Sequence, residues 1–383
     1  MKFTVRNNNN SKYKMKMKNQ TRKIYANKGG RRFGKGLKGS VLDICNHEKR
    51  DMNNLCRQLE SNEIETIIMY VSQNNRFQVP ITMDNPQEIA SFIDFLSSSH
   101  TENYVAKEFY NYLTRDVNFH DEINSYEPIS KVLTNENNIV GMPYRDNMLI
   151  GFEIKYKSSF LHLFDDKKYY VINKRCNQTM TSKIVRDFSV KTFETFIENI
   201  LEVIVKINEI NIAHRDIKLD NIMLCRNKGG GSKYRLIDWE MGRKLKYKKI
   251  ISNFTMGSCP AYYILSFGSM WETVYSKMIP RIIDITGGND ANSESTSQYL
   301  LDGIQYYKNI FEEERSQEHA FNKVKDGLDL FSFGVVLYGI LQHNSHVKSS
   351  KKYNEYVNFV NDMYKHTPRN VIKRFRKIVA NKG

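Results

Sequence analysis

The chain contains few cysteines, and their number and spacing argue against a small disulfide-bonded secreted domain and against a small zinc-binding domain. Its 383 residues include five cysteines, with no Cys-x-x-Cys pair and no Cys/His zinc pattern. An odd number does not suit a framework of paired disulfides in a secreted domain. We therefore expect a reducing compartment and place the protein in the cytoplasm. The five residues are Cys45, Cys56, Cys176, Cys225 and Cys259.

Long apolar runs are also lacking. The most apolar stretch, residues 329–341, is far too short to span a bilayer. No apolar segment follows the basic residues at the beginning of the sequence, so we expect neither a secretory signal nor a transmembrane segment. A length of 383 residues with 40% hydrophobic residues instead suits one domain with insertions.

Acidic residues are lacking at the beginning of the chain. Residues 1–38 contain thirteen Lys or Arg and no Asp or Glu, within a chain of net charge +16. We predict that residues 1–28 form a basic arm that binds a polyanion, either nucleic acid or an acidic protein; a membrane surface is a further alternative. A tail that only aids solubility is the competing interpretation. A second basic cluster lies near the other end, at Arg369, Lys373, Arg374, Arg376 and Lys377.

One octapeptide, residues 214–221, groups an acid, an ammonium and an amide at short spacing. In phosphoryl transfer the protein does little covalent work, so catalysis depends on positioning and charge neutralisation. Asp216 would accept a hydrogen bond from the attacking hydroxyl, Lys218 would lie against the γ-phosphate of ATP, and Asn221 would bind a magnesium ion. The alternative is a polar loop that closes a helix.

A second acid follows at the end of an apolar run. Two short strands, residues 222–225 and 234–237, are predicted on either side of a glycine-rich turn. This hairpin would bring Asp238 to the same cleft as Asp216. There Asp238 could bind the magnesium ion that bridges the ATP phosphates.

A glycine-rich stretch precedes an apolar strand early in the chain. Glycines let the backbone close over phosphates so that N–H groups replace their hydration. A bare glycine turn is the alternative, but the position well before residues 214–221 favours a phosphate loop. The candidate ATP-binding residues are Gly34, Gly36, Gly39 and Val41.

A candidate lysine for binding the α- and β-phosphates lies well beyond the glycine-rich stretch. No apolar strand carrying a lysine follows the glycine-rich stretch closely, whereas residues 103–109 form a strand-like run around Lys107. We assign the phosphate contact to Lys107, which makes residues 45–101 an insertion. The alternatives are that Lys38 supplies this charge, or that Lys107 is a solvated surface lysine.

A glutamate should form an ion pair that aligns Lys107. Two candidates lie in the helical stretch that follows, Glu122 and Glu127. Counting back from the predicted strand at residues 138–140 favours Glu127, but Pro128 beside it is a poor residue for a helix interior. Glu122 has Ile123 and Tyr126 on a packing face, and we prefer it narrowly.

These motifs together resemble the eukaryotic-type serine/threonine protein kinases. The resemblance runs from Gly34 to about Leu341, and Lys218, two residues after Asp216, resembles the serine/threonine branch. It implies an α+β, two-lobed protein kinase fold with a small β-rich N-lobe and a large helical C-lobe. It also implies ATP and Mg²⁺ as cofactors, and a protein substrate that presents serine or threonine. Arg215 is the arginine that in many family members receives a phosphate from the segment after Asp238.

The sequence departs from the family pattern in several places. The usual Asp-Phe-Gly is Asp238-Trp239-Glu240, and the usual Ala-Pro-Glu is replaced by residues 264–266. Loss of the glycine restricts the backbone freedom by which this segment changes state. The departures, the insertions and the Asn- and Lys-rich composition resemble the divergent kinases of large DNA viruses. On that resemblance, the location would be a host-cell cytoplasm or a virion.

The domain boundaries follow from these landmarks. We expect the basic arm at residues 1–28, an N-lobe at 29–173 with an insertion at about 45–101, and a C-lobe at 174–383 with an insertion at about 272–325. The first insertion is predicted to contain a hairpin, at residues 64–71 and 77–81, and a helix that begins at Pro86. The second is predicted to be rich in turns around residues 287–295.

Two helices are predicted to support the catalytic residues. One lies just before residues 214–221, where apolar residues recur at helical spacing. The other begins near Asp329 and resembles the central buried helix of the family's large lobe, which implies that the carboxylate of Asp329 braces the backbone of the catalytic loop. The apolar positions at helical spacing in the first are Phe193, Phe196, Ile197, Ile200, Leu201 and Ile204.

Two functions from different classes remain open at this point. The first is an active kinase that transfers the γ-phosphate of ATP to serine or threonine. The second is a pseudokinase or scaffold that uses the fold and the basic arm for binding. Retention of Asp216, Lys218, Asn221 and Asp238 favours the first, whereas Glu240 in place of glycine, the lost Ala-Pro-Glu and the displaced lysine favour the second.

Overall fold

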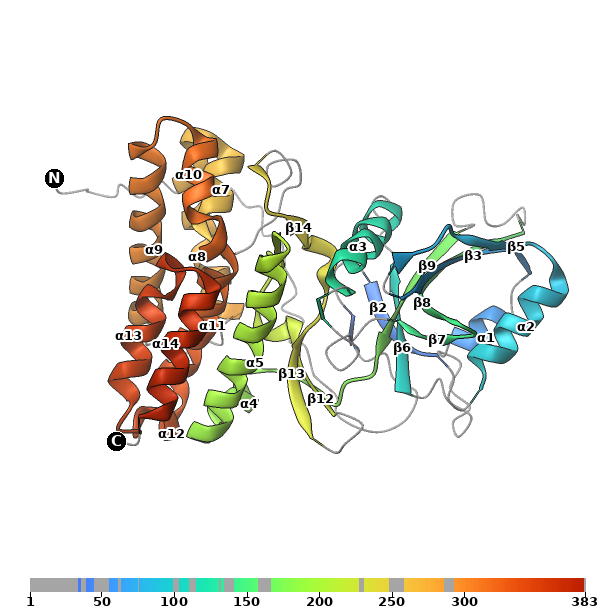
Figure 1. The fold of residues 1–383 in the computed structure, drawn as a ribbon, viewed down its shortest axis with the longest axis horizontal. Coiled ribbons are helices and arrows are strands. Elements are labelled where there is room, and N and C mark those ends of the chain that lie inside the picture. Colours follow the sequence, from blue (N-terminus) through green and yellow to red (C-terminus); the bar gives the residue numbers. More distant parts are fainter. Residues whose placement is uncertain are drawn as a thin grey trace, which may run out of the picture.

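The chain folds into a β-rich lobe and a helical lobe that lie side by side (Figure 1). This arrangement confirms the two-lobed α+β architecture expected from the sequence. The computed structural model describes residues 34–35, 39–44, 55–60, 63–74, 76–98, 103–109, 115–130, 132–133, 141–157, 167–226, 231–247, 258–285 and 293–381.

The β-rich lobe is built on one antiparallel sheet. Its strand order is β1-β2-β6-β9-β8-β3-β4, with β5 paired to β3 and β7 paired to β8. The strands are β1 (Gly34–Lys35), β2 (Gly39–Asp43), β3 (Ile64–Gln73), β4 (Arg76–Phe77), β5 (Ile81–Met83), β6 (Tyr104–Phe109), β7 (Met142–Tyr144), β8 (Asn147–Tyr156) and β9 (Lys167–Lys174).

The expected first insertion is part of this sheet. Strand β3 pairs along its length with β8 and therefore continues the sheet beyond it. The predicted hairpin is confirmed, because β4 and β5 both pair with β3, and Asn74 adopts the left-handed backbone of a turn. Helix α2 (Pro86–Leu96) begins where predicted, with the side chain of Asn85 accepting a hydrogen bond from the backbone N–H of Gln87.

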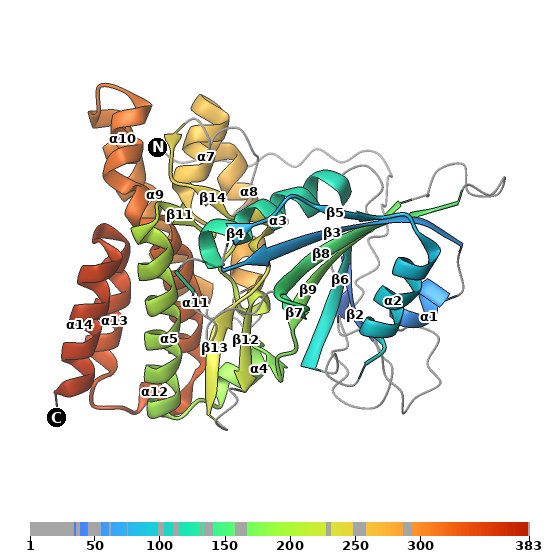
Figure 2. The same ribbon diagram turned by 45° about the vertical axis from the view of Figure 1, so that its right-hand side comes forward.

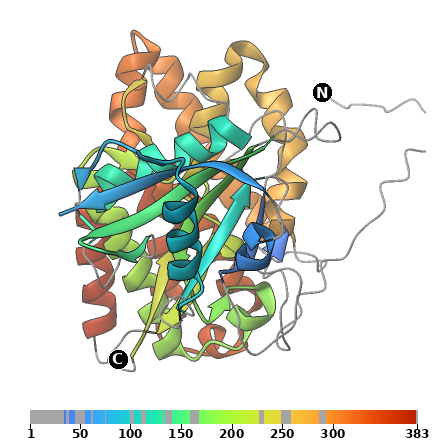
Figure 3. The same cartoon turned by 90° about the vertical axis from the view of Figure 1, so that its right-hand side faces the viewer.

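The two faces of the sheet are covered by different helices (Figure 3). Helices α1 (Leu55–Glu60) and α2 pack on one face, where they share a core with Leu42, Ala106 and Ile172. Because side chains alternate along a strand, Val41, Lys107 and Val171, which are paired across β2, β6 and β9, belong to the opposite face. That opposite face is the one turned toward α3.

Helix α3 (Arg115–Ser130) lies between the sheet and the helical lobe (Figure 2). It continues past Pro128, so this proline does not end the helix. Gly151 of β8 allows its close approach: a Cβ on Gly151 would lie 2.6 Å from the backbone oxygen of Tyr170 and 3.0 Å from Cδ1 of Ile123. The strand predicted at residues 138–140 lies outside the described residues.

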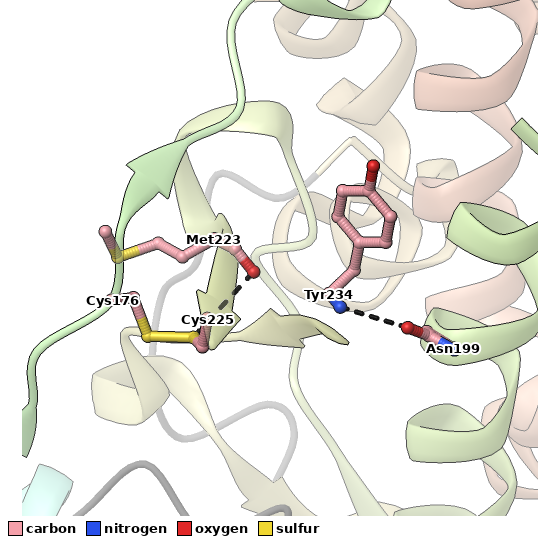
Figure 4. The surroundings of a disulfide bond; sticks show 5 residues. All are labelled: Cys176, Asn199, Met223, Cys225 and Tyr234. Carbon is pink, nitrogen blue, oxygen red and sulfur yellow. Dashed lines mark hydrogen bonds between the residues drawn. A yellow bond between two sulfur atoms is a disulfide. The ribbon is translucent and has the colours of Figure 1, made fainter. Parts of the chain in front are cut away.

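The segment after β9 connects the lobes and is cross-linked to the helical lobe. Cys176 follows β9 directly, and it forms a disulfide with Cys225 of β12 (Ile222–Arg226) (Figure 4). Cys56 is also disulfide-bonded, whereas Cys259 is free and buried. The expectation of a reducing compartment did not anticipate these bonds. Cys176 and Cys225 are far apart in the sequence, and only the fold brings them together.

The helical lobe is packed around α11 (Leu328–His343). Residues 328–341 of this helix are all buried, which confirms the predicted central helix. Its other helices are α4 (Ser182–Arg186), α5 (Val190–Glu209), α7 (Pro260–Phe267), α8 (Trp271–Ile285), α9 (Ser293–Glu313), α10 (Gln317–Val324), α12 (Ser345–Lys348), α13 (Tyr353–Asp362) and α14 (Pro368–Ala380), with short 3-10 turns η4 (Gly268–Met270), η5 (Lys325–Gly327) and η6 (Met363–Lys365).

The expected second insertion is largely helical. Helices α8, α9 and α10 occupy most of residues 272–325 and pack in the core of the lobe, where Tyr299 and Tyr307 lie against Phe331 of α11. Residues 286–292 lie outside the described part of the chain. The turns predicted at residues 287–292 therefore stay a prediction, whereas residues 293–295 belong to α9.

No helix among the described residues is long and apolar enough to cross a membrane.

Candidate active site

Residues 214–221, the candidate catalytic loop, are supported by two helices. Helix α5 begins at Val190 and is capped by Ser189, whose side chain accepts a hydrogen bond from the backbone N–H of Thr192. Its predicted apolar positions are all buried. From α11, the carboxylate of Asp329 accepts hydrogen bonds from the backbone N–H groups of His214, at 2.6 Å, and Arg215, at 2.9 Å. The predicted brace by Asp329 is therefore confirmed, and it fixes the backbone just before Asp216.

Within this loop, Asp216, Lys218 and Asn221 contact one another. The Nζ of Lys218 lies 2.5 Å from Oδ2 of Asp216. The Nδ2 of Asn221 donates to the same oxygen and to the backbone oxygen of Asp216, both at 2.9 Å. Asp216 and Lys218 are partly exposed, at 26% and 28%, so an acceptor group can reach them. The two bonds use the amide nitrogen of Asn221 and leave its oxygen as the atom suited to a metal.

Asp238 lies on the hairpin predicted from the sequence. Strands β12 and β13 (Ser232–Leu236) pair antiparallel, and the backbone N–H of Ile237 donates to the backbone oxygen of Asn221. Asp238 itself has φ 65°, a left-handed conformation that is unfavourable for a residue with a side chain. The 3-10 turn η3 (Trp239–Met241) follows it.

Trp239 anchors the segment after Asp238. Its ring is 1% exposed and lies 4.5 Å, centroid to centroid, from the ring of His214. The Nε2 of His214 also hydrogen-bonds the backbone oxygen of Ile237 at 3.0 Å. The larger ring in place of the usual phenylalanine therefore ties this segment to the catalytic loop.

The side chain of Lys107 lies between two carboxylates. One belongs to Glu122, the expected partner of the lysine, and the other to Asp238, the expected metal ligand. Its Nζ is 2.5 Å from Oε2 of Glu122 on α3 and 2.7 Å from Oδ1 of Asp238. The other oxygen of Glu122 accepts a hydrogen bond from the hydroxyl of Tyr126 at 2.6 Å. Glu122, the narrowly preferred candidate, is thus the glutamate that pairs with Lys107.

The electrostatics of these groups differ. Burial raises the pKa of Glu122, and attraction to Lys107 only partly offsets it. Desolvation acts in the same direction on Asp238, but Lys107 and then Lys218 outweigh it and lower the pKa of Asp238. Since Lys218 acts on Asp238 and also contacts Asp216, its ammonium group links the two acids. Asp238 is therefore ionised at neutral pH, as a metal ligand must be.

The glycine-rich stretch forms the beginning of the sheet. Gly34 and Val41 are paired across β1 and β2, and Gly39 opens β2. Val41 is also paired with Lys107, so the end of this hairpin lies beside the lysine. Gly36 and Lys38 lie outside the described residues.

Arg215 is buried beneath the helix that ends the segment after Asp238. It is 1% exposed, its guanidinium carbon lies 5.2 Å from the ring centroid of Tyr262 on α7, and its φ is 70°. A phosphate could contact this guanidinium only after α7 had moved. Three hydroxyls in the segment after Asp238 are candidates to carry such a phosphate: Ser258 is partly buried, and Ser252 and Thr255 lie outside the described residues.

The sequence analysis did not identify Tyr126 as a site residue. Its hydroxyl fixes the carboxylate of Glu122, and its ring is 2% exposed in the core. Its position four residues after Glu122 would have placed both on one helix face. It was used only as a packing residue in choosing between the two glutamates.

Comparison with known families supports part of this description. A family model of the protein kinase domain matches residues 131–263, which include the catalytic loop and Asp238. The chain has a two-lobed protein kinase fold. Lys107 and Glu122 precede the matched residues, so their assignment depends on the geometry above. No curated protein matches the chain.

Proposed function

We propose that the protein is an ATP-dependent protein kinase that transfers the γ-phosphate to serine or threonine hydroxyls of a protein substrate. The observation that carries this proposal is the position of Lys107, whose Nζ contacts both Glu122 and Asp238. A lysine held in this way can bind two phosphates of a nucleotide while Asp238 faces the same space. The match of residues 131–263 to the protein kinase domain supports the same reaction class.

The residues at the site fit a magnesium ion. Mg²⁺ prefers oxygen ligands and usually combines one or two carboxylates with the phosphates of its substrate. Asp238, with its lowered pKa, and the amide oxygen of Asn221 are donors of this kind. Bound there, the ion would neutralise phosphate charge.

The roles of the remaining residues follow from their contacts. Asp216 accepts a hydrogen bond from the attacking hydroxyl and orients it. Lys218, held 2.5 Å from Asp216, neutralises charge on the transferred phosphate. Gly34, Gly36, Gly39 and Val41 cover the nucleotide. Arg215 supports the loop from within the core and does not contact substrate.

A pseudokinase is the alternative, and one observation favours it. Trp239 and Glu240 stand where the family has phenylalanine and glycine. Trp239 packs against His214, which opposes a change of state in this segment. We favour the active enzyme because the same locking holds Asp238 in contact with Lys107. A segment that cannot change state in this arrangement is fixed in a form competent for metal binding.

The basic arm at residues 1–28 is proposed to recruit a polyanion, either nucleic acid or an acidic protein. The cluster near the other end is a weaker candidate, because three of its members form ion pairs within the chain. Arg369 pairs with Glu209, Arg374 with Asp362, and Arg376 with Glu198 and Glu202. A cytoplasmic location, in a host cell or a virion if the divergent character is viral, is part of the same proposal.

The direct test uses the purified chain, magnesium and ATP labelled at the γ-phosphate. An acidic and a basic generic protein serve as acceptors, and the labelled amino acids are identified after hydrolysis. We expect label on phosphoserine or phosphothreonine, dependent on magnesium. Nucleotide binding without transfer to either acceptor or to the chain itself would favour the pseudokinase.

A further inference from the structure

Helix α3 is tied to the segment after Asp238 by two contacts that the proposed reaction does not use. The Nη2 of Arg243, on β14 (Arg243–Lys244), lies 2.5 Å from Oδ2 of Asp121. The hydroxyl of Ser125 lies 3.0 Å from the backbone oxygen of Gly242 and 2.8 Å from that of Asp121.

These contacts lie on α3 beside the residues of the candidate site. Asp121 and Ser125 are four residues apart and form one row along the helix. Glu122 and Tyr126 form the next row, one residue further around the helix axis, and it is this row that faces Lys107. A rotation that withdrew Glu122 from Lys107 would therefore also pull Asp121 and Ser125 away from Arg243 and Gly242.

The charges around Arg243 strengthen this argument. Burial is the main cause of the lowered pKa of Arg215, and the positive charge of nearby Arg243 lowers it further. Two guanidinium groups that lie close together repel each other, and a nearby carboxylate offsets this repulsion. Asp121 supplies a carboxylate to Arg243, and this pair is partly buried, with the side chains 32% and 15% exposed. An ion pair shielded in this way is stronger than one on an open surface.

We propose that Asp121, Ser125 and Arg243 are positioning residues that hold α3 in the orientation in which Glu122 pairs with Lys107. They do this by fastening the helix to the backbone that follows Asp238, so that the lysine, its glutamate and the metal-binding acid are set as one unit. The effect on turnover rests on the proposed kinase function. The effect on the helix does not.

The test compares Asp121→Asn, which keeps the shape of the side chain and removes its charge, with the unmodified chain. Hydrogen exchange of α3 amides and phosphate transfer are measured on the same samples. We expect exchange within residues 115–130 to rise on the order of tenfold, the scale of coupling between contacting charged residues, while α11 is unchanged. We expect kcat to fall by a similar factor with little change in KM for the acceptor.

Three further variants separate positioning from general damage. Glu272→Gln breaks a comparable ion pair with Lys308, at 2.7 Å in the helical lobe, and should leave exchange in α3 unchanged. Asp121→Glu keeps the charge and should restore both readouts in large part. Ser125→Ala should increase exchange in α3 to a smaller extent.

Each outcome decides a separate claim. If exchange in α3 is no faster in Asp121→Asn and Ser125→Ala than in the control Glu272→Gln, the contacts do not hold the helix and the inference is wrong. If exchange rises but no variant, including the unmodified chain, transfers phosphate, the positioning role stands and the kinase proposal fails. If Asp121→Asn does not fold, Ser125→Ala and Asp121→Glu still decide between these results.

Discussion

Lys107 and Glu122 lie on different elements, strand β6 and helix α3, yet their side chains meet at 2.5 Å. The same ammonium group reaches Asp238 at 2.7 Å, far along the chain on the other lobe. One lysine therefore joins the sheet, the helix beside it and the hairpin that follows the catalytic loop. Loss of the Lys107 ammonium group should affect nucleotide binding more than it affects the fold.

Replacement of this lysine is the first prediction. Lys107→Met keeps most of the length of the side chain and removes its charge, so phosphate transfer should fall on the order of a hundredfold or more. Lys38→Met is the matched control and should have a mild effect, because its charge is not needed if Lys107 binds the phosphates. Steady-state rates of both variants decide the matter. The reverse ranking would overturn the assignment of Lys107.

The second prediction concerns pH. Burial raises the pKa of Glu122, while that of Asp238 is lowered, so acidification neutralises Glu122 first. The Lys107–Glu122 pair is then lost while Asp238 still binds metal. Affinity for a magnesium–nucleotide complex should consequently decline at a pH above the usual range of a glutamate, and Glu122→Gln should lack that decline.

The nucleotide also titrates, but it does so equally with the unmodified chain and with Glu122→Gln. The difference in affinity between the two proteins therefore reports on Glu122. Binding is a better readout than turnover, because burial also raises the pKa of Asp329, which lies under the catalytic loop. An identical acidic decline in both proteins would contradict the assignment to Glu122.

Much of the site could be predicted because its residues are close in sequence. Asp216, Lys218 and Asn221 lie within one loop, and Asp238 follows on a short hairpin whose two strands are evident from their apolar residues. The choice of Glu122 was also accessible from sequence, since the buried positions of α3 define the helix face. Helix α5 was recognisable from its apolar residues at helical spacing, and α11 from its strongly apolar run.

Other features depend on contacts between distant segments. Nothing local indicates that β3 pairs with β8, that Cys176 meets Cys225, or that Tyr262 covers Arg215. The sequence analysis therefore treated residues 45–101 as an insertion and the cysteines as indicators of a reducing compartment. It also treated Arg215 as accessible to a phosphate. Only the tertiary structure shows these relationships.

The third prediction concerns the contact between the sheet and α3. Gly151→Ala places a Cβ 2.6 Å from the backbone oxygen of Tyr170 and 3.0 Å from Ile123, which the neighbouring strand cannot relieve without moving. We expect a loss of about 1–3 kcal/mol in the free energy of unfolding, measured in urea, together with reduced turnover.

Gly268→Ala provides the contrast for this experiment. Gly268 has φ 52° but open space around it, so its substitution strains the backbone of the helical lobe without touching α3. It should destabilise the protein while leaving nucleotide affinity unchanged. If Gly151→Ala is as stable and active as the unmodified chain, the close packing of α3 on β8 is not needed.

The fourth prediction concerns the basic arm. Deletion of residues 1–28 removes nine Lys or Arg and leaves the glycine-rich stretch whole, so turnover on a short peptide should hardly change. Binding to duplex DNA should weaken and lose much of its salt dependence, because each neutralised phosphate contributes a slope of about 0.9.

Lys373→Gln combined with Lys377→Gln serves as the control, since both side chains are exposed on α14. This pair should change the salt slope much less than the deletion does. An unchanged slope after deletion of the arm would show that it is a solvated tail.

The central claim is that Asp216 serves the transfer of phosphate and not the binding of nucleotide. The most direct measurement compares Asp216→Asn with the unmodified chain, in parallel for transfer of labelled phosphate and for affinity toward magnesium–ATP, with Asp238→Asn as the variant expected to lose both. We predict that Asp216→Asn abolishes transfer and leaves affinity nearly intact, because the change removes the acceptor for the attacking hydroxyl and keeps Lys107 and Asp238 in place. Turnover equal to that of the unmodified chain would contradict the account.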